Sequence, residues 1–147
     1  MKSTPFGAEP QVRGRKNIIH FEDGIYGFET VKDFVLLKQD EGGAVWSLQA
    51  ADADYPSLIV VNPFLIFPDY SPALSAADRK RLGNPRSEDL CFLTVAVIKQ
   101  NLADSVVNLK SPVVINVSKR IGRQVILEDN DYPVRCRLFR GAAAGRE

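Results

Sequence analysis

The run LCFLTVAVIK at residues 90–99 is the longest apolar stretch of the chain, and it decides the class of the fold. It is rich in valine, isoleucine, threonine and phenylalanine, which favour extended backbone. It is also far shorter than the roughly 20 apolar residues that a membrane-spanning helix needs. We therefore expect a long, mostly buried β-strand at this position.

Shorter runs of the same composition lie on both sides of this strand. Each is bounded by glycine, proline, asparagine or aspartate, which commonly end strands. Pro112 separates two of the runs and must lie at an edge or a bulge, because proline cannot donate to a strand ladder. The predicted strands are residues 16–21, 34–37, 44–49, 58–61, 64–67, 90–99, 106–109, 113–117, 124–128 and 134–138.

A single short helix is predicted near residues 75–82. Ser75 is a candidate N-cap, with Asp78 three residues later, and Gly83 can end the helix just before Pro85. One helix cannot supply the crossovers of a doubly wound α/β sheet. The pattern therefore predicts an all-β (mostly) fold, a closed or nearly closed barrel with the helix across a mouth or a sheet edge, because closure hides strand edges.

Length and composition indicate one ordinary globular domain. The chain has 147 residues, of which 45% are hydrophobic and 25% charged, with a net charge of +1. So small a net charge argues against a general nucleic-acid binder, which needs a strongly basic surface. Residues 16–140 are expected to form the domain. Residues 1–15 are expected to be a flexible leader and residues 141–147 a flexible tail.

The cysteines and the N-terminus suggest a soluble, reducing, intracellular setting. Cys91 lies in an apolar run and is interpreted as a buried structural thiol. Cys136 stands between Arg135 and Arg137, whose charges favour a thiolate, although an ordinary thiol near the end of the last strand is the simpler interpretation. The N-terminal residues lack the apolar core of a signal peptide.

No residue pattern points to a catalytic, cofactor-binding or metal-binding site. His20 is the sole histidine, and no serine or cysteine nucleophile motif accompanies it. The carboxylates fall mostly in turns, where solvated turn formers are common. Two alternatives stay open: a hydrolytic barrel that uses His20 with a turn carboxylate, and a barrel that binds a small molecule in an apolar cavity.

Two features could serve protein contacts. The stretch NPFLIFPDY at residues 62–70 combines aromatic residues with two prolines, so it should bend sharply. It is either a corner that fills the core or a groove that docks another polypeptide. Four basic residues form either a solvated helix face or a surface that steers a partner. These are Arg79, Lys80, Arg81 and Arg86.

Several motifs together resemble the flagellar assembly factor FliW family. The stretch IHFEDGIYGFE at residues 19–29 is similar to the N-terminal signature of that family, and later motifs follow in the family order over residues 16–138. Tyr26 departs from this pattern, where proline is frequent, as does Ala50, where serine is frequent. The later motifs are SLQ (47–49) with Asp54, VNPF (61–64), PDY (68–70), NLKSPVVIN (108–116), GRQVIL (122–127) and Tyr132.

The resemblance implies a small mixed-sheet β pseudo-barrel without a catalytic site, in the bacterial cytoplasm. Members of this family bind the translational regulator CsrA and relieve its repression of flagellin translation. They also bind flagellin as a chaperone, so that flagellin and CsrA compete for one protein in a homeostatic partner switch. No nucleic acid, membrane or cofactor is implied.

Four residues are the candidate protein contacts. Phe64, Asp69 and Tyr70 come first, because the proline-bounded aromatic bend is the least ordinary feature of the chain. Asn116 comes second, since it lies near a predicted strand end with an amide that is free to pair with a partner's backbone.

Overall fold

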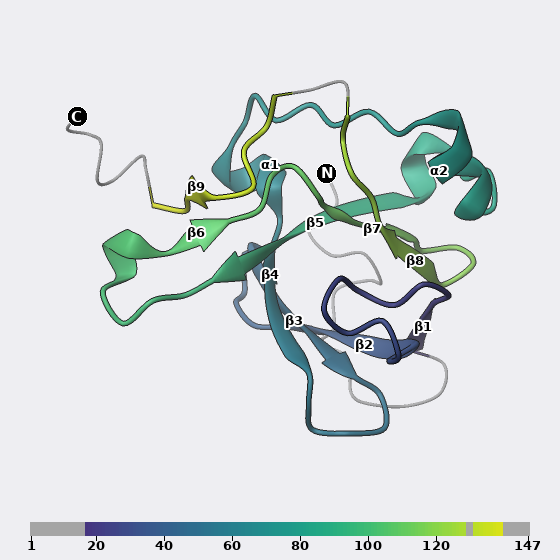
Figure 1. The fold of residues 1–147 in the computed structure, drawn as a ribbon, viewed down its shortest axis with the longest axis horizontal. Coiled ribbons are helices and arrows are strands. Elements are labelled where there is room, and N and C mark those ends of the chain that lie inside the picture. Colours follow the sequence, from purple (N-terminus) through teal and green to yellow (C-terminus); the bar gives the residue numbers. More distant parts are fainter. Residues whose placement is uncertain (1–16, 129–130, 140–147) are drawn as a thin grey trace.

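The computed structural model describes residues 17–128 and 131–139 (Figure 1). The expected leader, residues 1–15, and the expected tail, residues 141–147, lie outside the described residues, so both expectations stay predictions.

The described chain forms one mixed sheet that closes into a barrel of seven strands. The barrel order is β4-β3-β2-β1-β8-β7-β5, and β5 pairs back onto β4. Every pairing is antiparallel except that of β1 with β8. The prediction of a mostly β, mixed-sheet barrel is therefore confirmed. The barrel strands are β1 (Ile18–Phe21), β2 (Asp33–Lys38), β3 (Val45–Ala50), β4 (Ser57–Val61), β5 (Leu90–Val97), β7 (Val113–Asn116) and β8 (Ile121–Gln124).

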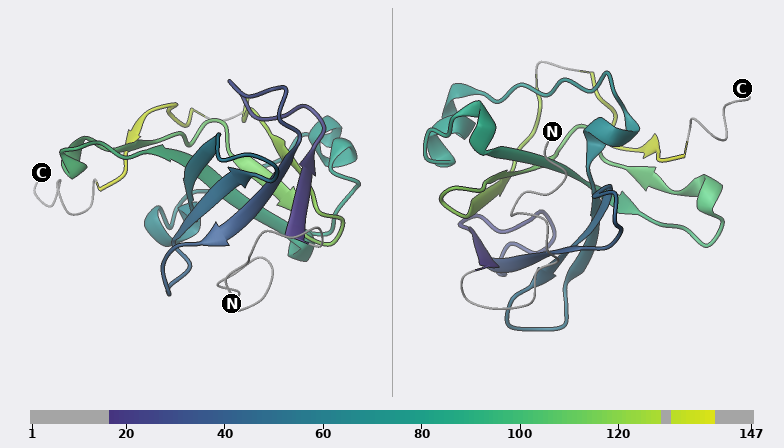
Figure 2. Two further views of the ribbon diagram at one scale, coloured as in Figure 1. Left: turned by 90° about the horizontal axis from the view of Figure 1, so that it is seen from below. Right: turned by 180° about the vertical axis from the view of Figure 1, so that it is seen from behind.

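The long strand β5 joins the barrel to a projecting ribbon. Its first half pairs with β7 and its second half with β4. Its last residues also pair with β6 (Val106–Val107), which in turn pairs with β9 (Cys136–Arg137). Pro112 lies in the interruption between β6 and β7, as its missing N–H requires. Figure 2 shows the β5–β6 ribbon extending beyond the barrel.

Side chains from six of the seven barrel strands fill the interior. The strand β8 contributes no residue to this hydrophobic cluster, and its Gly122 lies opposite Phe21 in the parallel pairing. A second cluster of buried residues packs outside the barrel and includes Leu82, Tyr70 and Leu109. The buried members of the inner cluster are Ile19, Phe21, Ile25, Phe34, Leu36, Trp46, Leu48, Val60, Leu93, Val113 and Ile115.

The predicted helix is present as α2 (Ala76–Arg81). The Ser75 hydroxyl accepts a hydrogen bond from the Asp78 backbone N–H at 3.0 Å, as an N-cap should. Gly83 ends the helix with a φ of 83°, a conformation that glycine adopts without a steric penalty. No helix in the described part of the chain is long and apolar enough to cross a membrane.

Some strand predictions were wrong in type or in extent. Residues 64–67, expected as a strand, lie in and next to the helical turn α1 (Pro63–Ile66). The Asn62 side chain caps that turn by accepting from the Phe64 N–H, and Pro63 has the φ that a first helical position needs. The strand expected at 124–128 is β8, which lies earlier, and the run at 134–138 contributes only β9. The described residues also contain the 3-10 turns η2 (Ser87–Asp89) and η3 (Leu102–Asp104).

Candidate functional site

The aromatic bend at residues 62–70, which includes α1, takes part in a compact cluster of rings. Phe64 lies 5.9 Å from both Tyr70 and Phe92, measured between ring centroids, and Tyr70 lies 4.7 Å from Tyr132. Phe64 is 41% exposed, so one of its faces is open to solvent. The bend therefore both fills the outer core and presents an aromatic ring at the surface.

Tyr70 is a buried anchor of this cluster. Its side chain is only 5% exposed, and its hydroxyl donates to the Leu109 carbonyl at 2.7 Å. Burial, with a smaller contribution from nearby Tyr132, raises the pKa of Tyr70 well above its ordinary value. The Tyr132 hydroxyl accepts from the Ser71 backbone N–H at 2.8 Å. Tyr70 thus supports its exposed neighbours Phe64 and Asp69 rather than standing on the surface beside them.

A surface hollow of about 410 Å³ adjoins the bend. Asp69 and Tyr70 both line it, whereas Phe64 and Asn116 do not. The structure therefore brings two of the four candidate residues together at this hollow. Its lining residues are Ile66, Phe67, Pro68, Asp69, Tyr70, Leu109, Tyr132, Pro133 and Cys136.

The expectation that Asn116 has a free amide was wrong. The residue is 1% exposed, and its Nδ2 donates to the Leu82 carbonyl at the end of α2 at 2.7 Å. Its Oδ1 accepts from the backbone N–H groups of Ser118 and Lys119, at 3.1 and 3.3 Å. Asn116 therefore ties the end of α2 to the turn between β7 and β8.

His20 lies beside a carboxylate, but on an open face of the barrel. Its Nδ1 is 2.8 Å from Asp33 Oδ1, and the two side chains are 53% and 43% exposed. Neither residue lines any of the three surface hollows described for this structure. A general base needs a pocket that positions a substrate proton within reach. The position of His20 therefore does not support the hypothesis of a hydrolytic barrel.

The structure of the barrel also gives little support to the hypothesis that it binds a small molecule in an apolar cavity. Side chains fill its interior, and three hollows among the described residues, of about 420, 300 and 410 Å³, open to the surface. No three His, Cys, Asp or Glu side chains within residues 17–128 and 131–139 gather where they could hold a metal ion.

The two cysteines differ in their surroundings. Cys91, expected to be buried, is half-buried; it packs against the inner barrel cluster, and burial raises the pKa of its thiol to about 12. Cys136 lies buried in β9, near the end of the described chain. The interpretation of Cys91 as a structural thiol agrees with this packing.

The raised pKa of Cys91 predicts a loss of stability at alkaline pH. The folded chain keeps a thiol proton that the unfolded chain releases above about pH 8.5. The contribution of Cys91 to the free energy of unfolding is therefore complete below that pH. It declines as the pH rises toward 12, by up to about 1.4 kcal/mol per pH unit. Urea unfolding at several pH values measures the slope. Cys91→Ala should make the free energy of unfolding fall less steeply with pH between about pH 8.5 and 10. Equal slopes in both proteins would contradict the prediction.

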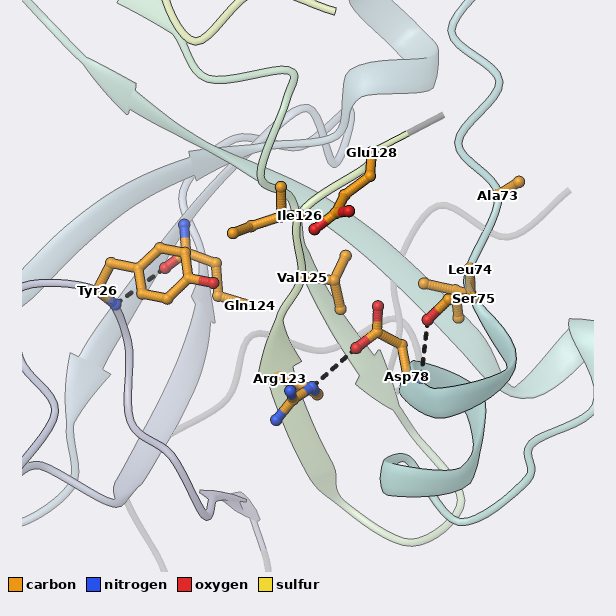
Figure 3. Close-up of a pocket in the computed structure, with 10 residues that line it drawn as sticks. All are labelled: Tyr26, Ala73, Leu74, Ser75, Asp78, Arg123, Gln124, Val125, Ile126 and Glu128. Carbon is orange, nitrogen blue, oxygen red and sulfur yellow. Dashed lines mark hydrogen bonds and ion pairs between the residues drawn. The ribbon is translucent and has the colours of Figure 1, made fainter. Parts of the chain in front are cut away.

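A second hollow of about 420 Å³ lies between α2 and β8 (Figure 3). Arg123 on β8 crosses one side of it, where its Nε donates to Asp78 Oδ1 at 3.0 Å. Arg123 also pairs with Asp23 in the loop after β1, and Asp23 lies 3.3 Å from Arg81 of α2. Partial burial acts to lower the pKa of Arg123, but the hydrogen bonds to the two carboxylates raise it. Through these contacts Arg123 connects the loop after β1, the helix α2 and the strand β8.

The basic set singled out in the sequence is largely engaged within the molecule. Arg79 donates to the Pro85 carbonyl at 3.1 Å, and Arg81 pairs with Asp23. Arg86 pairs with Glu88 and Asp89 of η2. These contacts favour the interpretation as a solvated helix face over a steering surface.

The sequence did not indicate that Asp23, Tyr26 and Arg123 lie at or beside the hollow between α2 and β8. Asp23 and Arg123 are 100 positions apart in the chain, so no local motif joins them. The nearest signal was Tyr26, a large aromatic residue in a glycine-bounded loop.

Comparisons with known proteins agree with the fold. A family model described as "FliW protein" matches residues 3–138. The flagellar assembly factor FliW of Caldicellulosiruptor saccharolyticus is 40% identical over 124 residues, which cover 84% of this chain and 81% of that protein. The flagellar assembly factor FliW of Caldicellulosiruptor bescii is 39% identical over 139 residues, covering 95% and 90%.

A solved structure extends the likeness to three dimensions. The crystal structure of a flagellar assembly factor FliW superposes with a TM-score of 0.79 at 34% identity, covering 86% of this chain and 88% of that one. The motifs from residue 16 to 138, the mixed barrel and these matches agree. The chain belongs to the FliW family of flagellar assembly factors, which are not enzymes.

Proposed function

We propose that this chain acts in the bacterial cytoplasm as a partner switch between CsrA and flagellin. It binds CsrA and relieves the repression of flagellin translation, and it binds flagellin as a chaperone. Flagellin that accumulates occupies the chain and frees CsrA, so that synthesis falls until flagellin is exported. The observation that carries the proposal is membership of the FliW family, whose model matches residues 3–138.

The surface of the molecule supports a role in protein contacts. Aromatic residues are enriched where proteins bind one another, and Phe64 is 41% exposed on a turn that Asn62 caps. Asp69 is also exposed, later in the same bend. We keep these two residues as proposed contacts, with Tyr70 as their support. Asn116 is not kept, because the chain itself uses its amide.

Calorimetric titration with purified CsrA and flagellin from the same organism tests the proposal. We expect the chain to bind each partner in separate titrations, and flagellin to displace CsrA from a preformed complex. Phe64→Ala combined with Asp69→Ala should weaken at least one of the two affinities by about tenfold, as the loss of an aromatic anchor does. Asp52→Ala, which removes an exposed carboxylate elsewhere, is the matched control.

Two outcomes count against parts of this account. If the chain binds neither protein at micromolar concentration, the proposed function is wrong. If it binds both, and the Phe64 and Asp69 substitutions change neither affinity, the bend serves the core alone.

A further inference from the structure

Exposed apolar side chains gather on the ribbon that projects from the barrel, residues 97–107 and 134–139, which we call the β9 ribbon. Five of the ten large apolar side chains that are exposed in the described part of the chain belong to it. Such a concentration marks an interaction site more often than single scattered residues do. The five are Val97, Ile98, Leu102, Val134 and Phe139.

The strand β9 is the last of the sheet, so within the described residues one of its two long edges has no strand beside it (Figure 1). Its other edge pairs with β6. Just after β9, the Leu138 N–H donates to the Ser105 carbonyl at 2.9 Å, which continues that pairing. Hydrogen bonding alternates along an antiparallel pair, so the N–H of Arg137 points away from β6. The strand therefore presents a backbone donor on its open edge.

Exposure alternates along the last residues of the β9 ribbon. Cys136 and Leu138 are buried, whereas Arg135, Arg137 and Phe139 are exposed. Successive side chains of an extended strand point to opposite faces. Arg135, Arg137 and Phe139 therefore share the outer face, and a strand added at the open edge would place its own side chains beside them.

The β9 ribbon carries more positive than negative charge. Lys99, Arg135 and Arg137 are its cations, and Asp104 is its one carboxylate side chain. Within the described residues none of these four side chains has an ion-pair partner. Opposite charges on neighbouring strands attract one another. The open edge of β9 thus fits a strand with acidic side chains.

The same charges argue against a second copy of this chain as the occupant. Two β9 strands that joined edge to edge would place arginine opposite arginine, whether the twofold axis passed at Cys136 or at Arg137. Like charges directly opposite one another destabilise a strand pair. Cations on a short edge strand are also a means by which proteins prevent such edge-to-edge association. A different chain with acidic side chains does not meet this repulsion.

Of the two partners in the proposed function, the charge of the β9 ribbon favours flagellin. CsrA regulates translation by binding RNA, and a protein that binds RNA carries cations for the phosphates. The cations of the β9 ribbon would repel such a surface. A chaperone, in contrast, covers apolar segments of its client, and the β9 ribbon offers apolar side chains together with an open backbone edge.

We propose that an extended segment of flagellin, with acidic side chains on one face and apolar side chains on the other, adds to the open edge of β9 as a further strand. A carbonyl of the segment accepts from the Arg137 N–H, and its carboxylates lie beside Arg135 and Arg137. Its apolar side chains extend the buried face to which Cys136 and Leu138 belong. Main-chain hydrogen bonds supply affinity in this mode of binding, and alternate side chains supply specificity. The proposal rests on the proposed function, because it names the surface at which flagellin binds.

Calorimetric titration of charge variants with purified flagellin and with CsrA tests the choice of partner. Arg137→Glu should weaken the affinity for flagellin by about tenfold or more, with a larger effect at low salt. Lys80→Glu is the matched control. It makes the same change of net charge at an exposed residue of α2, which lies on the other side of the molecule from β9 in Figure 1, and should change the affinity by less than about twofold. Neither variant should alter the affinity for CsrA.

Two further variants test the addition of a strand. Arg137→Val removes the charge and keeps the backbone N–H, whereas Arg137→Pro removes both. Proline is tolerated on an edge strand where the N–H faces solvent, so the pairing with β6 should survive. Arg137→Pro should bind flagellin about tenfold more weakly than Arg137→Val, because the segment loses its backbone donor. In the unaltered chain, bound flagellin should slow the hydrogen exchange of the Arg137 amide.

The outcomes separate this proposal from the proposed function. If the unaltered chain does not bind flagellin, both proposals are wrong. If it binds flagellin, and Arg137→Glu weakens that affinity no more than Lys80→Glu does or weakens the affinity for CsrA instead, the docking edge is wrong and the proposed function stands. Equal affinities of Arg137→Pro and Arg137→Val would show that no strand is added to β9. Circular dichroism and thermal unfolding establish that each variant is folded, and if Arg137→Pro is not, the exchange of the Arg137 amide in the unaltered chain decides.

Discussion

Phe21→Ala is expected to lower the free energy of unfolding by about 3–5 kcal/mol, the usual cost of removing a buried aromatic ring. Phe21 is fully buried, and its ring packs edge-on against Phe34 with a centroid distance of 5.3 Å. It also pairs with Gly122 where β1 and β8 run parallel, the one parallel step in the barrel order of the described residues. Urea unfolding followed by circular dichroism measures the loss.

Gly122 supplies the matched test of the same contact. A Cβ at this position would lie 2.4 Å from Phe21 Cζ, so Gly122→Ala should itself cost about 1–3 kcal/mol through overpacking. In the double variant the ring is gone and the added methyl group has space. The combined loss should therefore be smaller than the sum of the single losses. Additive losses, or a loss below about 1 kcal/mol for Phe21→Ala, would contradict this account of how the barrel closes.

Asn116→Ala is expected to cost about 2–4 kcal/mol, because it removes three hydrogen bonds from a buried site. The Leu82 carbonyl at the end of α2 would lose its side-chain donor, and the turn after β7 would lose its acceptor. Chemical unfolding measures the loss, and Ser118→Ala is the control, because it alters an exposed side chain in the same turn.

The same variant distinguishes a structural amide from a contact residue. Where the Asn116→Ala protein is folded, its affinity for CsrA and flagellin should equal that of the unaltered chain. A variant that is as stable as the unaltered chain but binds a partner more weakly would restore Asn116 as a contact.

Local signals in the sequence account for what could be predicted of the fold. Ser75 and Gly83 mark both ends of α2 within a few residues, so the helix was found. Short valine-rich and isoleucine-rich runs indicated the strands, and the order of motifs indicated the family. The run at 64–67 was misassigned because four apolar residues suit a strand or a helical turn equally, and the deciding signal was the Asn62-Pro63 cap before it.

The sites depend on contacts that no local pattern contains. Asn116 lies 34 positions from Leu82, whose carbonyl it binds, so the sequence placed it at a strand end but not against α2. Tyr70 could be identified as unusual but not as buried. Two surface hollows join residues of the β1–β2 loop to residues near 97, 126 and 134, which only the folded chain brings together.

A reconstituted translation assay tests the central claim most directly. A reporter that carries the flagellin mRNA leader is translated with CsrA, with CsrA and this chain, and with both plus purified flagellin. We expect CsrA to repress the reporter, the chain to restore its translation, and flagellin to return it to the repressed level. If the chain leaves repression by CsrA unchanged, or if flagellin does not cancel the relief, the partner switch is contradicted.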